Sequence, residues 1–143
     1  MTGVQTCGSS DLTSRVGEVL TASQVAQYRR ENPVCELNSF TMIPAMFRCK
    51  TPSEIHHIFS VRRRLDLLSV IINLSKPAHD WCHRNPVEGR VLCLLVKARK
   101  GELRESELKK ASGMYPAGWL AMKRDDISIE WMSPFVDELE GYL

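Results

Sequence analysis

The sequence predicts an α+β domain in which a short β-hairpin leads into a helix and further helices surround both. Three observations predict this fold. Apolar runs of strand length lie at 55–59 and 70–74, and Pro77 opens a segment that can be helical. Beyond it, segments with helical spacing are separated by glycine and proline. We therefore expect a core at about 53–86 and a helical extension at 87–143.

Composition indicates one globular domain. The chain has 143 residues, 43% hydrophobic and 25% charged, and its net charge of +2 is too small to indicate a nucleic-acid partner by itself. The five cysteines lack the spacing of a small secreted domain, and no apolar run is long enough to span a bilayer. We expect an intracellular, cytoplasmic protein without membrane contact. Its oligomeric state stays open.

The N-terminal part is expected to contribute one helix. Residues 1–20 are polar and aperiodic, so we expect them to be disordered or non-native, with a single domain at 21–143. Thr21 or Ser23 can cap a helix that ends before Pro33. The segment that follows reads as a loop, and a turn then leads into the first strand.

The C-terminal extension is divided by its caps. An amphipathic helix at 87–100 is closed by glycine, and a second helix follows at 102–111. A third helical piece begins at Tyr115, and 127–132 has the composition of a short strand. The last helix starts at Ser133, which is followed by proline.

All four histidines lie in the predicted core. His56 and His57 are adjacent on the first strand, whereas His79 and His83 are four residues apart on the predicted helix. Residues four apart share a helix face, and successive strand residues face opposite sides. Two imidazoles from the helix and one from the strand can hold a divalent ion and leave positions for water and substrate. Adjacent histidines often have no chemical role, but gathering all four in one window favours a site.

In these residues the sequence resembles the HNH endonucleases, the ββα-metal nucleases. EIHHIF matches their histidine pair at the end of a strand, and HDWCHRNP matches their ligand-bearing helix. The resemblance implies one divalent ion on His56, His79 and His83, with His57 as the general base. It also implies hydrolysis of phosphodiester bonds in DNA, no nucleotide cofactor, and a phage or mobile-element setting.

Two features depart from the family pattern. Val70 stands where the family has its asparagine, and Asn73 is the nearest candidate for that catalytic role. Many members also hold a structural zinc with paired Cys-x-x-Cys knuckles. Only half of one such knuckle is present, at Cys35, so we expect no structural zinc.

The loop after the first strand carries three consecutive arginines, Arg62, Arg63 and Arg64. Such runs are often only solvated surface, but arginine can bind phosphate oxygens with two hydrogen bonds, and nucleic-acid contact is an equal alternative. The ion stays open among Mg, Mn, Zn and Ni. Imidazoles favour zinc or nickel, whereas magnesium prefers oxygen ligands, of which only Glu54 adjoins the histidine pair.

Two other functions fit the same residues. The chain can be a catalytically silent relative that binds nucleic acid or a partner protein, which Val70 and the missing cysteines favour. Alternatively, Cys35, Cys49 or Cys82 can join the histidines in a closed tetrahedral site that only stabilises the domain.

Overall fold

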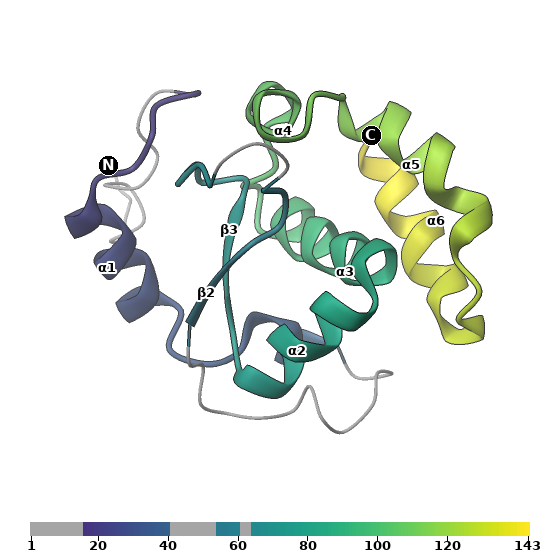
Figure 1. Cartoon of the computed structure of the whole chain (residues 1–143), viewed down its shortest axis with the longest axis horizontal. Coiled ribbons are helices and arrows are strands. Elements are labelled where there is room, and N and C mark those ends of the chain that lie inside the picture. The colour runs from purple at the N-terminus through teal and green to yellow at the C-terminus, as the bar shows by residue number, and fades with distance from the viewer. Residues whose placement is uncertain (1–15, 41–53, 61–63) are drawn as a thin grey trace, which may run out of the picture.

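The computed structural model describes residues 16–40, 54–60 and 64–143. In chain order, with η for a 3-10 helix, its elements are α1 (Ala22–Glu31), η2 (Glu36–Ser39), β2 (Glu54–His57), β3 (Ile71–Leu74), α2 (Lys76–Arg84), α3 (Pro86–Arg99), α4 (Glu105–Ser112), α5 (Pro116–Lys123), η4 (Arg124–Asp126), η5 (Glu130–Met132) and α6 (Ser133–Tyr142). The predicted α+β class, a short hairpin surrounded by helices, is confirmed (Figure 1). Of the helices in these ranges, none has the length and apolar content needed to cross a membrane.

The hairpin separates two unequal cores. Strands β2 and β3 pair antiparallel, with His56 opposite Ile72 and His57 opposite Ile71. Residues directly opposite one another share a face, and successive residues alternate between faces. Ile72 belongs to the main core, whereas Ile71 packs with Tyr28 in a smaller core beneath α1. The hairpin therefore lies between α1 on one side and α2 and α3 on the other (Figure 1).

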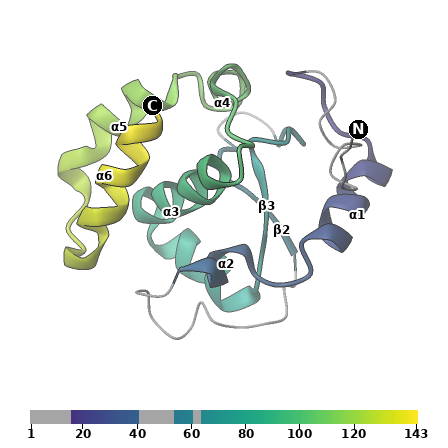
Figure 2. The same ribbon diagram turned by 180° about the vertical axis from the view of Figure 1, so that it is seen from behind.

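Helix α3 is the central element of the main core. Residues 91–98 are all buried, and the helix contacts α2, α6 and η2. Figure 2 shows it between the hairpin and the α5–α6 pair. The prediction of an amphipathic helix was wrong, because neighbours cover α3 on every side. A helix that is buried all round needs no polar face.

The helices around the hairpin begin as their caps predict. Thr21 and Gln24 form a reciprocal capping box at the start of α1. Ser75 caps α2 directly after β3, so the chain reverses from strand to helix with no intervening loop. Asn85 ends α2, and Pro86 begins α3. These tight connections hold α2 beside the hairpin.

Several predicted boundaries differ from the structure. The expected strand at 127–132 is wrong, because Glu130–Met132 forms the 3-10 turn η5 and brings Met132 into the core. Residues 16–20, which we expected to be outside the domain, contact it. Leu20 is buried, and its backbone N–H donates to the Asp66 carbonyl at 2.7 Å. Residues 1–15 lie outside the described ranges.

Candidate metal centre

The structure brings three of the predicted residues together. One ligand nitrogen from each of His56, His79 and His83, which we call the histidine site, lies within 4.8 Å of the other two. The Nε2 atoms of His79 and His83 are 2.9 Å apart. Two nitrogens bound tetrahedrally to one zinc ion lie roughly 3.3 Å apart, so this spacing is close to that of two ligands sharing an ion. Because α2 follows β3 directly, the face of α2 that carries His79 and His83 lies toward His56 on β2, and the three rings converge.

Burial differs among the three imidazoles. His56 is 9% exposed, His79 is half-buried and His83 is exposed. Burial, followed by the neighbouring His79 and His83, lowers the pKa of His56 to about 3. His56 is therefore neutral near pH 7, and one of its ring nitrogens carries a free lone pair. The site lies at the border between core and solvent.

Glu54 orients His79. Its carboxylate accepts a hydrogen bond from His79 Nδ1, and this bond lowers the pKa of Glu54. With Nδ1 donating, Nε2 is the acceptor nitrogen, and it is the atom that faces His83. A carboxylate behind a ligand histidine fixes the tautomer and raises the basicity of the ligand. Glu54 thus belongs behind the site rather than in it.

His57 has a separate partner. Its Nε2 lies 2.7 Å from Asp66 Oδ1, on the chain between the two strands. An Nε2–H donated to this carboxylate leaves Nδ1 as the proton acceptor. His57 lies outside the group formed by the other three histidines. The sequence pattern did not single out Asp66, because one acidic residue in a loop carries no signal.

A small hollow of about 100 Å³ adjoins the histidines. His56, His57, Cys82, His83 and Arg90 are among its lining residues. Arg90 donates from Nε to the Ile58 carbonyl at 3.1 Å, and this bond fixes its guanidinium at the rim. Sequence reasoning missed Arg90, because its helix gives no sign of facing β2. An arginine beside three imidazoles suits an anion such as phosphate.

A larger hollow of about 460 Å³ lies elsewhere, between α1, η2 and the end of α3. Its lining includes Asn32, Val34 and Lys100 but none of the histidines. We place the chemistry at the smaller hollow, because the converging ring nitrogens are there.

The structure does not bring Asn73 to the histidines. Its side-chain amide donates to the Asn32 carbonyl at 2.9 Å, and its backbone N–H donates to Glu36 Oε2 at 2.8 Å. The strand alternation also places Asn73 on the hairpin face opposite His56. Val70 is fully buried and has no side-chain amide. Neither Asn73 nor Val70 therefore supplies an amide to the histidine site.

The arginines are only partly described. Arg62 and Arg63 lie outside the described residues, and Arg64 is exposed. Their predicted phosphate contact stays a prediction.

A second group of possible ligands lies on the inner side of His56. Ligand atoms of His56, Cys82 and Cys93 are also within 4.8 Å of one another. The pKa of the Cys93 thiol is well above its usual range, first because it hydrogen-bonds with Cys82 and then because it is buried. Cys35 is buried in the main core and is not in this group, and Cys49 lies outside the described residues. No sequence signal separates Cys93 from the apolar residues around it.

Comparisons with protein-family models, with curated proteins and with solved structures found no match to this chain.

Proposed function

We propose that this chain is a metal-dependent endonuclease that hydrolyses phosphodiester bonds of DNA. The observation that carries the proposal is the convergence of His56, His79 and His83, from a strand and the helix that follows the hairpin. Three neutral imidazoles can hold one divalent ion and leave open positions, as a catalytic ion requires. A bound ion would polarise a phosphate oxygen and stabilise the departing 3′ oxygen.

His57 is the proposed general base. Asp66 accepts a hydrogen bond from His57 Nε2–H, which fixes the ring, so His57 Nδ1 can take a proton from the attacking water. The same carboxylate then stabilises the imidazolium that forms. His57 and His56 both line the hollow, but strand alternation places the His57 side chain on the other face of the hairpin, so His57 is not one of the ligands.

The ligand set favours zinc or nickel among the four ions considered. Its donors are imidazole nitrogens, which suit these borderline ions. The nearest carboxylate, Glu54, is engaged with His79, so the site lacks the oxygen ligands that magnesium prefers. We therefore propose that zinc or nickel binds most tightly and magnesium least.

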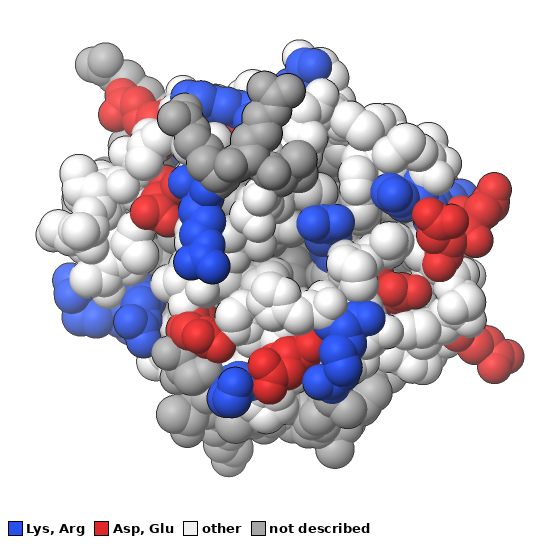
Figure 3. All heavy atoms as spheres, viewed as in Figure 1, with Lys and Arg blue, Asp and Glu red and all other residues white. Residues whose placement is uncertain are grey.

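We propose that a few local basic residues contact DNA, and that the protein surface as a whole has no strong positive potential. On the face shown in Figure 3, basic and acidic side chains are interspersed. Arg90 lines the hollow and Arg64 is exposed on the chain that leads to β3. With Arg62 and Arg63, they would neutralise phosphates beside the scissile bond.

A second candidate is a domain that binds DNA without cutting it. The observation in its favour is the position of Asn73, whose amide is committed to Asn32 on the other side of the hairpin. If the asparagine role is required, the chain would retain metal and DNA binding and lack cleavage.

Nicking of supercoiled plasmid tests the proposal. Metal-free protein is incubated with plasmid and with Mg²⁺, Mn²⁺, Zn²⁺ or Ni²⁺ in turn. We expect nicking by the parent and a roughly 10²–10⁴-fold lower rate for His57→Ala, with bound metal unchanged. Glu138→Gln is the control, because Glu138 pairs with Arg99. If the parent binds DNA and metal but nicks with none of the ions, the second candidate replaces the first.

A further inference from the structure

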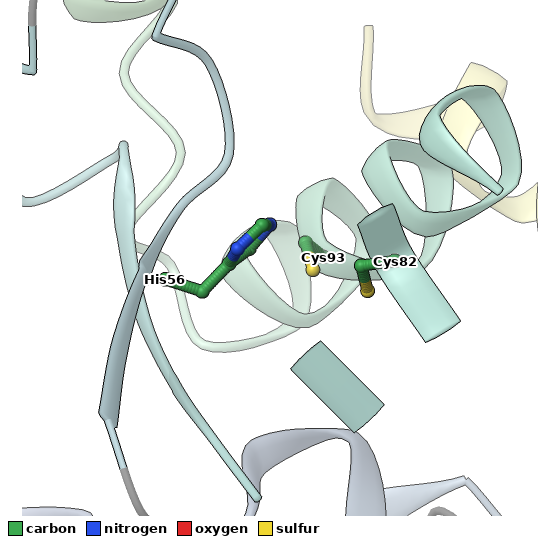
Figure 4. A group of neighbouring side chains, drawn as sticks. All are labelled: His56, Cys82 and Cys93. Carbon is green, nitrogen blue, oxygen red and sulfur yellow. The ribbon is translucent and has the colours of Figure 1, made fainter. Parts of the chain in front are cut away.

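His56 belongs to two overlapping sets of metal ligands. On one side are the rings of His79 and His83, and on the other are the thiols of Cys82 and Cys93. Figure 4 shows the His56 ring reaching from β2 toward the two sulfur atoms. The described residues contain no other such group.

The packing of α2 on α3 places the two thiols together. A Cβ atom at Gly89 would lie 2.9 Å from the Cys82 Cα, so only glycine allows α2 to approach this closely. Cys93 follows Gly89 by four residues and thus lies on the same face of α3. Cys82 lies against Gly89, and Cys93 lies one helical turn farther along the same face of α3, so the two thiols meet.

We propose that His56, Cys82 and Cys93 form a second metal site, the thiol site, which takes a thiophilic divalent ion such as Zn²⁺ or Cd²⁺. Two thiolates and one imidazole are a common ligand set for such ions. The hollow is lined by His56 and Cys82, so it gives access to the site and room for water as a fourth ligand. Binding converts two S–H groups to metal–sulfur bonds and releases two protons to solvent.

The thiol site and the histidine site exclude one another. A neutral imidazole has one acceptor nitrogen, so His56 can ligate one ion at a time. An ion in the thiol site leaves the histidine site with two ligands. Soft ions should therefore select the inner thiols and inhibit chemistry at the outer site. This inhibition rests on the proposed nuclease function, whereas the existence of the thiol site does not.

Titration with Co²⁺ or Cd²⁺ tests the thiol site without any measurement of activity. Thiolate ligands give an ultraviolet charge-transfer absorption, at longer wavelength for Co²⁺ than for Cd²⁺, that imidazole ligands do not give. With metal-free protein kept reduced by a phosphine, we expect this band in the parent and in His79→Ala. Loss of the band is expected in Cys93→Ala, with Cd²⁺ affinity lowered more than the roughly 10–100-fold typical of an outer-shell residue.

Cys35→Ala is the matched control, since Cys35 is equally buried but lies outside both ligand sets. Cys82→Ala repeats the test if Cys93→Ala fails to fold, as judged by circular dichroism. A parent without the band, or a band of full intensity in both Cys82→Ala and Cys93→Ala, overturns the thiol site. Two Cd²⁺ ions bound per chain, with both lost in His56→Ala, would overturn the exclusion. Absence of plasmid nicking alone contradicts only the nuclease proposal.

Discussion

The histidine site and a cluster around the buried Lys97 differ in how their polar atoms are satisfied. In the lysine cluster, formed by Tyr28, Glu36, Lys97 and Glu102, Lys97 donates to the Tyr28 hydroxyl at 2.8 Å and to Glu102 at 2.9 Å. Tyr28 in turn donates to Glu36 at 2.6 Å. In the histidine site, ring nitrogens face one another instead, with the Nε2 atoms of His79 and His83 2.9 Å apart. The lysine cluster is complete as a structural element, whereas the histidine site has the arrangement that a cation would stabilise.

Burial acts on both clusters, with different consequences. Burial lowers the pKa of Lys97, while Glu102 and Glu36 oppose that shift. Because acid and base are both present, the buried charge is balanced within the protein. At His56 every neighbouring charge that matters is basic, so burial and neighbours act in the same direction. His56 therefore stays neutral near pH 7 and available to a metal.

The largest expected effect comes from breaking the lysine cluster. Lys97→Met removes the fully buried cation that donates to Tyr28 and Glu102. Lys100 still pairs with Glu36 and Glu102, so we expect a loss of about 3 kcal/mol in the free energy of unfolding. Urea unfolding of the metal-free protein measures it. Lys109→Met is the control, because Lys109 is exposed. A loss below about 1 kcal/mol would show that the cluster contributes little.

The next effect separates Glu54 from the ligands. Glu54→Gln keeps the shape of the side chain but weakens the acceptor for His79 Nδ1. We expect Zn²⁺ affinity to fall by about 10–100-fold without loss of the site. Calorimetric titration measures it, with Glu138→Gln as the matched carboxylate control. An unchanged affinity would mean that Glu54 does not tune His79.

Acid should destabilise the metal-free protein through His56. Its folded pKa of about 3 lies below the usual value of 6.5, so the unfolded chain binds more protons between these limits. Stability is therefore lost as the pH falls from 6.5 toward 3, by about 1.5–2 kcal/mol on reaching pH 5. Unfolding curves of the parent and of His56→Gln isolate this effect. Equal pH slopes in the two proteins would remove His56 as the cause.

The smallest effect concerns the loop arginines. Alanine at Arg62, Arg63 and Arg64 should flatten the dependence of log affinity for DNA on log salt by about one unit for each phosphate that the variant no longer neutralises. Fluorescence anisotropy with a labelled duplex at several salt concentrations measures the slope. The same slope in the triple variant would show that these arginines are only solvated surface.

The sequence predicted the elements that local signals define. Caps and prolines located α1 and α2, and the spacing of His79 and His83 placed both on one helix face. Tertiary packing decided the rest. Pairing with Asn32 turned Asn73 away from the site, a relation across 41 positions that no local pattern encodes. Cys93 was hidden in an apolar run because a metal ligand and a core residue look alike there.

Metal content of the histidine variants tests the central claim most directly. The measurement is best made with Ni²⁺ in a Cys93→Ala background, which removes the thiol site. We predict one bound ion per chain in that background and in its His57→Ala derivative. Occupancy should be lost when His56, His79 or His83 is changed to alanine. Full occupancy in all three variants would contradict the histidine site, and so would an equal loss in His57→Ala.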